Sequence, residues 1–283
     1  DIDFVFANYP NCTLAYIDIL KKLQIPVRYY GMDLHFIRLH REYEITGNIS
    51  SEEASEECLE KEKYLIDNCD IVYYPSQVEI DIVKNQFHKA AARVLKANFY
   101  KDENIVNTYS ACDRTGIMFI GGYKHAPNVD AVKWFVKDIF PYIDSKLDMT
   151  FSIIGADMPP EIANLKSEKI ETIGYVTDEE LEEIYKKIKL VVIPLRFGAG
   201  VKGKVIEAMF HGIPVLSTTV GMEGIPHITK ADLIADDAES FRKALENIYS
   251  DHMLLNEVSC EETEIIREHY SENAAWSSIA EDF

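Results

Sequence analysis

The sequence predicts an α/β fold with two parallel sheets. Short apolar runs alternate with stretches of helical period along the chain, which is the pattern of parallel strands joined by helices. A length of 283 residues exceeds one typical core and suits two domains. A hydrophobic content of 47% is enough for both domains to form cores. We therefore expect two Rossmann-like domains joined by one linker.

The first domain is expected at residues 1–108. Its predicted strands are short apolar runs at 4–7, 27–30, 71–74 and 93–95. Helical patterns separate these runs near 13–23, 52–68 and 77–87. The segment 102–114 is polar and has no hydrophobic period, so it predicts the linker.

The second domain is expected at residues 109–262. Its predicted strands lie at 117–121, 150–154, 169–173, 190–195, 214–218 and 232–235. Its predicted helices lie near 128–147, 178–188, 202–211 and 238–249. Six strands alternating with helices make a full Rossmann-like unit. The remaining residues, 251–283, have a helical pattern throughout.

The composition excludes several classes of partner. Forty-eight acidic against 29 basic residues give a formal net charge of −19, which repels nucleic-acid phosphates, so we expect no nucleic-acid partner. No apolar run approaches the roughly 18 residues of a membrane helix, and residues 1–3 lack the features of a signal peptide. We expect no transmembrane segment. Peripheral contact with a membrane stays open, because a local basic patch can act within an acidic protein.

The cysteines indicate a reducing compartment. They are widely spaced, odd in number and form no C-x-x-C pair: Cys12, Cys58, Cys69, Cys112 and Cys260. This pattern predicts neither a disulfide framework nor a zinc site. The expected location is the cytoplasm.

The most informative segment runs from residue 190 to residue 212. An apolar strand is followed by a loop that contains Gly198, Gly200 and Gly203, and then by a helix that ends at Gly212. Glycines let a backbone approach a ligand closely, and the start of a helix directs N–H groups and a partial positive charge at an anion. The segment therefore predicts a site for a diphosphate.

Charged side chains extend this prediction to a nucleotide. Lys202 and Lys204 add full positive charges, and Glu207 lies one helical turn after Lys204, on the same face. A carboxylate at that place could hold the two hydroxyls of a ribose. The alternative is an ordinary tight turn followed by a solvated glutamate, since neither G-x-G-x-x-G nor a Walker A loop occurs.

Five blocks of sequence, in order, resemble one enzyme family. They lie at 119–122 with 127–131, at 153–155, at 173–176, at 198–212, and at 214–219 with 221–224. Residues 117–283 resemble the donor-binding half of glycosyltransferases of the GT-B fold, specifically family 4, which are retaining enzymes that use nucleotide sugars. The resemblance implies two Rossmann-like domains that face each other across a cleft. It also implies that residues 263–283 form a helix packing back towards the first domain.

The function implied by this resemblance is that of a hexosyltransferase. Such an enzyme transfers a sugar from a nucleotide-sugar donor to a hydroxyl acceptor on a glycan, a lipid-linked molecule or a protein, typically in polysaccharide or glycan biosynthesis. Two alternatives stay open, a nucleotide-sugar epimerase of the same GT-B fold and a non-catalytic nucleotide-sugar-binding module. The first domain offers fewer strands than the family's acceptor domain. We therefore expect it to be truncated, and two explanations stay open: an upstream segment of the same protein is missing, or the protein has lost half of its acceptor domain.

Two departures from the family pattern change the assignments. The first glutamate of the family's E-x7-E motif falls on Ala199, whereas the second is present as Glu207. The family's usual arginine and lysine fall on Gly122 and near Pro127. The diphosphate is instead assigned to the nearby cations Lys202, Lys204 and Arg196.

The donor is expected where several loops meet. Ligands of open α/β sheets lie beyond the carboxyl ends of the strands, so the predicted strands of the second domain should end at one cleft. The expected donor-binding residues besides Glu207 and Arg196 are Gly121, Gly122, Gly198, Gly200, Tyr175, Val176, Thr219, Gly221 and Glu223. The glycines would admit the diphosphate or sugar, Tyr175 and Val176 would contact the base, and Glu223 would bond sugar hydroxyls. The alternative for each residue is a structural role, as a turn, as packing or as a solvated side chain.

The expected catalytic residues are Lys204, Lys202, Asp33 and His35. The lysines would neutralise the leaving diphosphate, which is electrostatic catalysis without a metal or other cofactor. The only D-x-D spelling noted for a metal, at residues 1–3, is not on a donor loop. Asp33 and His35 lie in a segment that resembles the family's acceptor-facing one, although many members have a histidine where this chain has Met32. His35 and Arg38 could share a helical face and hold an acceptor phosphate, or belong to a solvated charged face.

Overall fold

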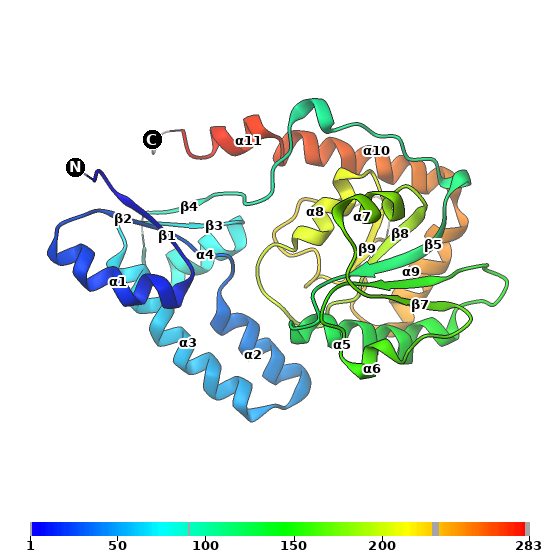
Figure 1. The fold of residues 1–283 in the computed structure, drawn as a ribbon, viewed down its shortest axis with the longest axis horizontal. Coiled ribbons are helices and arrows are strands. Elements are labelled where there is room, and N and C mark those ends of the chain that lie inside the picture. The colour runs from blue at the N-terminus through cyan, green and yellow to red at the C-terminus, as the bar shows by residue number, and fades with distance from the viewer. Residues whose placement is uncertain (1, 90, 228–231, 281–283) are drawn as a thin grey trace.

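Two separate parallel sheets organise the molecule, one in each of two domains (Figure 1). The structure, a computed structural model, describes residues 2–89, 91–227 and 232–280. The first domain lies on the left of Figure 1, in blue and cyan, and the second on the right, mostly in green, yellow and orange. The predicted α/β class with two Rossmann-like domains is confirmed.

The first domain contains a four-stranded sheet in the order β1-β2-β3-β4, with all strands parallel. Its strands are β1 (Val5–Asn8), β2 (Val27–Tyr30), β3 (Ile71–Tyr74) and β4 (Ala92–Val94). Its helices are α1 (Pro10–Lys22), α2 (His35–Thr46), α3 (Ile49–Asn68) and α4 (Gln77–Gln86). Because parallel strands end at the same edge, the loops after β1 and β2 lie together there.

Helix α2 is an element that the hydrophobic period did not predict. None of the residues in this described helix is fully buried, although Phe36 and Ile37 pack partly buried against the first core. It ends at Gly47, which has the left-handed conformation (φ 70°) typical of a glycine after a helix. With α3 it forms a hairpin beside the second domain (Figure 1). This arrangement brings the charged residues of α2 to the boundary between the domains.

The second domain contains a five-stranded parallel sheet in the order β7-β6-β5-β8-β9. Its strands are β5 (Thr115–Ile120), β6 (Phe151–Ile154), β7 (Ile170–Ile173), β8 (Ile188–Ile193) and β9 (Val215–Ser217). Its α-helices are α5 (Ala126–Trp134), α6 (Pro160–Ala163), α7 (Asp178–Tyr185), α8 (Gly203–Phe210) and α9 (Ala238–Ser250). Short 3-10 helices at Asp102–Asn104 and Ala111–Asp113 lie in the connection between the domains.

Two predicted elements of the second domain differ in the structure. The strand expected at 232–235 is a single bridge between Ser217 and Ile234, because β9 is only three residues long and offers little ladder to extend. The helix expected at 128–147 is α5 followed by a π-helical turn at Phe135–Ile139 and a 3-10 turn at Phe140–Tyr142. Pro141 lacks an N–H group, which explains why regular helix does not continue through this position.

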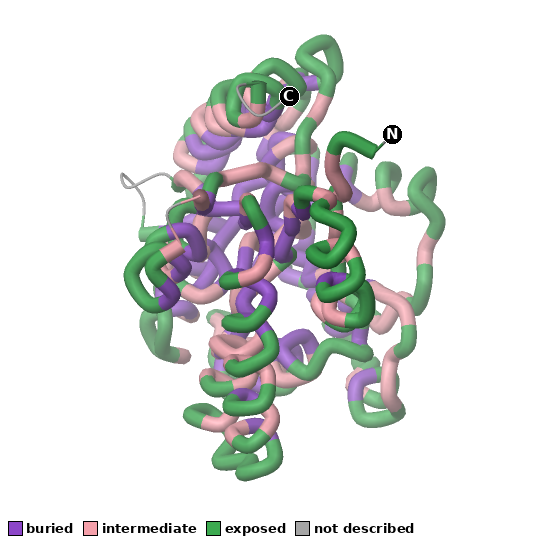
Figure 2. The backbone as a smooth tube through the Cα atoms, turned by 90° about the vertical axis from the view of Figure 1, so that its left-hand side faces the viewer, coloured by how far each residue is buried: buried purple, intermediate pink, exposed green. Residues whose placement is uncertain are grey.

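Strand β8 lies between β5 and β9 in the second sheet, and all six of its residues are buried. A continuous apolar run of this kind is expected for a parallel strand covered on both faces. Pro194 follows the strand and cannot donate to the ladder, so the chain leaves the sheet there and enters the glycine loop. Figure 2 shows the buried backbone gathered in the interior and the exposed backbone on the outer helical turns.

The C-terminal helices connect the two domains. Helix α10 (His252–His269) packs on the second domain, and α11 (Glu272–Ser277) lies near the first (Figure 1). The backbone N–H of Tyr100 donates to the carbonyl of Tyr270 (2.8 Å), and the Nζ of Lys96 donates to the carbonyl of His269 (2.8 Å). Within the described residues, no helix combines the length and the apolar character needed to cross a bilayer.

Candidate active site

The glycine loop reaches across to the first domain. Gly200 has a positive φ of 74°, and a Cβ atom built on it would lie 2.8 Å from the Cβ of Asp33 and 3.0 Å from the carbonyl oxygen of Met32. Only a glycine fits this conformation and this contact without strain. The close approach that the glycines were expected to allow is therefore, at Gly200, an approach between the two domains.

Helix α8 begins directly after this loop. It runs from Gly203 to Phe210, and its N-cap residue Lys202 makes no side-chain capping bond to the described chain. The first N–H groups of a helix have no partner within the helix and attract anions. The start of α8 therefore points open donors and a partial positive charge at the cleft.

Lys204 lies in a crowded place behind the loop. Its Nζ donates to Oδ1 of Asn128 (2.7 Å) and lies 4.2 Å from the ring centroid of Phe119. Burial, and secondarily the charge of Lys202, lowers the pKa of Lys204 to about 7. A Cβ on Gly121 would lie 2.6 Å from this Nζ, so Gly121 is the residue that makes room for the lysine.

Lys202 and Glu223 form an ion pair beside the loop. The Nζ of Lys202 donates to the carbonyl of Gly200 (2.6 Å) and lies 3.6 Å from Oε2 of Glu223. The two side chains are 9% and 15% exposed. Burial lowers the pKa of Lys202, and the nearby carboxylate of Glu223 works in the opposite direction.

Glu223 was expected to bond sugar hydroxyls, but in this structure both of its oxygens accept bonds from Arg41. Arg41 Nη1 lies 2.9 Å from Oε2 and Nη2 lies 2.7 Å from Oε1. Arg41 belongs to α2 in the first domain, so this pair spans the boundary. Sequence reasoning assigned no role to Arg41, because nothing in the order of residues indicates a partner 182 positions away.

Glu207 lies on α8, one turn after Lys204. Burial is the main cause that raises its pKa, and Asp178 at the start of α7 raises it further. The loop between β7 and α7 carries Tyr175, which is 77% exposed, and Val176, which packs partly buried against the core. Glu207 and this loop therefore lie at the same carboxyl edge of the sheet, as a nucleoside site would require.

Arg196 is engaged elsewhere in the second domain. Its Nε donates to Oδ2 of Asp130 (2.9 Å), and its Nη2 bonds the other carboxylate oxygen. The pKa of Arg196 is raised, chiefly by this hydrogen bond. A diphosphate would have to compete with Asp130 for Arg196, so the lysines are better placed to bind it.

The remaining predicted donor residues have different surroundings. A Cβ on Gly122 would meet no described atom within 4 Å, so this position is open, and Gly198 has a positive φ of 152°. Thr219 is held by Asp236, which accepts from both its N–H and its Oγ1 (2.7 Å each). A Cβ on Gly221 would clash with Ser217 and Ile193, so the structural alternative of close packing accounts for this glycine.

Asp33 and His35 lie across the cleft from the lysines. The Nδ1 of His35 lies 2.8 Å from Oε1 of Glu62, whose carboxylate also accepts from the backbone N–H of His35 (2.9 Å). The hydrogen bond to Glu62 is the main cause that raises the pKa of His35. Asp33 accepts from Nε of Arg38 (3.1 Å). Glu62 was missed by sequence reasoning because it comes from the middle of α3.

Two adjoining cavities fill the space between the domains. One, of about 410 Å³, is lined by Asn8, Tyr9, Pro10, Met32, Asp33, His35, Arg38, His125, Ala199 and Val201. The other, of about 250 Å³, is lined by Asp33, Arg38, His125, Pro127, Asn128, Leu195, Phe197, Gly198, Ala199, Val201, Lys202 and Lys204. The fold thus brings together both predicted lysines and Asp33, and it adds His125 and Asn128, which sequence reasoning had not assigned.

Comparison with known proteins identifies the second domain. The family model described as "Glycosyl transferases group 1" matches residues 114–251. The second domain is of the group 1 glycosyltransferase type. This confirms the resemblance seen in the sequence. Because the match includes the glycine loop and α8, the lysines lie within the part of the chain that the family shares.

One curated relative matches part of this chain. It is an uncharacterized 44.6 kDa protein in the cps region of Klebsiella pneumoniae, 27% identical over 172 residues, which are 58% of this chain and 44% of that protein. The chain therefore spans less than half the length of this relative.

Solved structures extend the likeness to both domains. Sucrose-phosphate synthase from Thermosynechococcus elongatus has a TM-score of 0.74 at 17% identity, covering 99% of this chain and 71% of that one. HepE from Anabaena, solved in complex with UDP and glucose, has a TM-score of 0.74 at 16% identity, covering 99% and 77%. At these identities the likeness shows that the whole chain has the GT-B fold.

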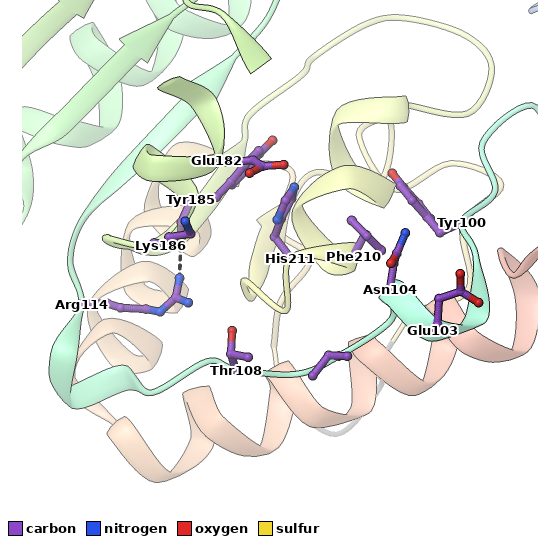
Figure 3. Close-up of a pocket in the computed structure, with 11 residues that line it drawn as sticks. Tyr100, Glu103, Asn104, Thr108, Arg114, Glu182, Tyr185, Lys186, Phe210 and His211 are labelled. Atoms are coloured by element: carbon purple, nitrogen blue, oxygen red, sulfur yellow. Dashed lines mark hydrogen bonds between the residues drawn. The ribbon is translucent and has the colours of Figure 1, made fainter. Parts of the chain in front are cut away.

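A larger cavity of the glycosyltransferase-type domain lies away from this cleft. It measures about 680 Å³ and is bordered by the last turns of α7 and α8 and by the linker, at the opposite end of α8 from the glycine loop (Figure 3). The rings of Tyr185 and His211 stack in its wall, with centroids 4.3 Å apart. None of the predicted site residues lines it. Volume alone therefore does not locate the site, whereas the lysines and the helix start do.

Proposed function

We propose that the chain transfers a sugar from a nucleotide-sugar donor to a hydroxyl acceptor, with retention of configuration. The observation that carries this proposal is the pair of partly buried lysines, Lys202 and Lys204, at the uncapped start of α8, across one cleft from Asp33. The match to the group 1 glycosyltransferases supports a transferase. The UDP and glucose bound to HepE support a nucleotide sugar as the donor.

The donor's diphosphate is proposed to bind at the start of α8. The helix N–H groups and the ammonium groups of Lys202 and Lys204 would surround it with positive charge. Glu207, one turn further along α8, would accept bonds from the ribose hydroxyls. The base would then lie against the loop that carries Tyr175 and Val176.

The lysines are proposed to act on the leaving group. As the bond between the sugar and the diphosphate breaks, negative charge grows on the diphosphate. Preorganised positive charge in a site with little water stabilises that change without reorganisation, and the proposed mechanism uses no metal. The electrostatic interaction with the new anion would be strongest at Lys204, because the present partner of Lys204 is the neutral amide of Asn128.

The acceptor is proposed to enter the cavity of about 410 Å³ beside α2. Asp33 lines both cavities, so its carboxylate would orient the acceptor hydroxyl towards the sugar. His35 faces only the acceptor cavity, and its bond to Glu62 favours the imidazolium, which would attract an anionic group on the acceptor. The acceptor classes are a glycan, a lipid-linked molecule or a protein.

The setting proposed for this reaction is the biosynthesis of a polysaccharide or glycan in the cytoplasm, at the membrane surface when the acceptor is lipid-linked. The gene region named for the Klebsiella relative supports a polysaccharide role. Free thiols at all five cysteines agree with a reducing compartment.

A ligand screen followed by product analysis tests the proposal. A bound ligand raises the melting temperature by mass action, so UDP, GDP, ADP, CMP and dTDP should separate into one that stabilises the protein and others that do not. The matching sugar nucleotide should then yield free nucleoside diphosphate and a glycosylated acceptor. An isomerised donor without any acceptor would indicate the epimerase, and tight binding without turnover would indicate a binding module. The comparisons favour neither.

A further inference from the structure

Arg41 makes three hydrogen bonds across the domain boundary. Besides the two bonds to Glu223, its Nη1 donates to the carbonyl of Gly198 in the glycine loop (2.7 Å). The side chain is 29% exposed, and its carboxylate partner is 15% exposed. Charge-assisted bonds of this geometry are the stronger kind, and their partial burial reduces screening by salt. Arg41 therefore holds both the loop and Glu223 when the two domains are together.

Glu223 lies between two cations with different tasks. Its Oε2 accepts from Arg41 at 2.9 Å but lies 3.6 Å from the Nζ of Lys202, which is too long for a good hydrogen bond. Lys202 instead donates to the carbonyl of Gly200. The carboxylate is thus committed to Arg41, and Lys202 keeps donor capacity for another anion.

The domain contact is tight on both sides of this pair. A Cβ on Gly200 would press on Asp33 and Met32, and a Cβ on Gly224 would lie 2.5 Å from Cβ and Oγ of Ser76. Both glycines have positive φ, 74° and 75°. The first domain therefore touches the second on either side of Glu223, and Arg41 can reach Glu223 only when the domains approach closely.

We propose that Arg41 is a positioning residue which, when the domains are together, holds the carboxylate of Glu223 beyond hydrogen-bond distance of Lys202 and so leaves the N–H groups of that ammonium available to the donor's diphosphate. The proposal rests on the proposed function of the cleft. Without Arg41, the carboxylate would pair directly with Lys202, the nearest other cation in contact with it. An arginine suits the task, because its planar fork binds both carboxylate oxygens and still reaches the carbonyl of Gly198.

A single variant and a double variant distinguish this role from one in which Arg41 only holds the two domains together. We expect Arg41→Met to weaken the binding of the nucleoside diphosphate selected in the screen about tenfold, the effect of losing one charge-assisted interaction. Adding Glu223→Gln to that variant removes the competing carboxylate and should restore affinity to within about threefold of wild type. Adhesion alone predicts no recovery, because the contact between the domains is absent from both variants. The affinity of Arg41→Lys for the nucleoside diphosphate should lie between that of wild type and that of Arg41→Met.

The controls make a failure interpretable. Arg242→Met removes an ion pair with Glu246 that lies within one helix, so it should leave affinity unchanged. Circular dichroism and melting curves establish that each variant is folded. Calorimetry then measures affinity without any need for turnover. A double variant as weak as Arg41→Met, with both proteins folded, would overturn the proposal.

The proposed function can fail separately. If wild-type protein binds none of the nucleoside diphosphates, the donor assignment is wrong, and this inference falls with it. If wild type binds one of them and the double variant shows no recovery, only the role of Arg41 is wrong. Small-angle scattering adds a readout independent of any ligand, since Arg41→Met should increase the radius of gyration while Arg242→Met should not.

Discussion

The Nζ of Lys204 lies 2.7 Å from Oδ1 of Asn128, so this ammonium is held by a neutral amide and not by a carboxylate. Burial and the neighbouring charge of Lys202 lower its pKa to about 7. A bound diphosphate would supply the opposite charge that the amide lacks, and would return the lysine to its charged form. Proton uptake and donor binding should therefore be coupled at this residue.

Donor affinity should fall as the pH rises above about 7, the pKa of Lys204 in the free protein. The limiting slope for uptake of one proton is about tenfold in affinity per pH unit. The measurement is isothermal titration of the nucleotide sugar between pH 6 and pH 9, in buffers of different ionisation enthalpy to count protons. Lys204→Met should bind weakly with a flat profile. If this variant kept the slope, another group would be responsible.

Lys204 should lower the free energy of unfolding of the ligand-free protein. Its folded pKa of about 7 is below the ordinary lysine value of 10.5, so between these values the unfolded chain binds more protons. Stability from this residue therefore rises with pH across that window and is lowest below it. Lys204→Met should raise the melting temperature most near pH 6.5 and least near pH 10. An equal effect at both values would mean that the pKa is not depressed.

Glu207→Gln should weaken the binding of the nucleoside diphosphate by about 1.5–3 kcal/mol, the range for hydrogen bonds to a charged group. The physical reason is that an amide oxygen accepts more weakly from the ribose hydroxyls than a carboxylate does. Titration of the ligand against wild type and variant measures the difference. Glu239→Gln, which changes an exposed glutamate on α9, is the matched control and should bind as wild type. Unchanged affinity in Glu207→Gln would remove the ribose assignment.

Gly200→Ala should reduce stability and activity more than Gly47→Ala does, although the two glycines have nearly the same φ, 74° and 70°. Both changes carry the left-handed strain of about 1–2 kcal/mol. A methyl group at Gly47 meets no described atom within 4 Å, whereas at Gly200 it presses on Asp33 and Met32. The added cost is therefore a loss of domain closure.

Melting curves and turnover separate these two costs. Gly47→Ala should lower stability alone, while Gly200→Ala should also lower the rate of sugar transfer. Equal rates in the two variants would show that the contact of Gly200 with the first domain is not needed for activity.

Much of the glycine loop could be predicted because its signals are local. The apolar run of β8, the proline that ends it and the glycines that follow act within a few residues of one another, so their order indicates strand, loop and helix. The capping box at Thr177, with Glu180 three residues later, likewise marks the start of α7. By contrast, α2 was not predicted, although Phe36 and Ile37 pack partly buried against the first core.

The sequence by itself determined the two-domain α/β fold and the place of two lysines at the start of α8, because chain neighbours establish strand ends and helix starts. Only the tertiary structure decided the partners of those charges. Arg196 pairs with Asp130, 66 positions away, and Glu223 pairs with Arg41 across the domain boundary. Such pairing depends on which side chains burial brings within a few ångströms, and residues far apart in the chain carry no local record of that distance.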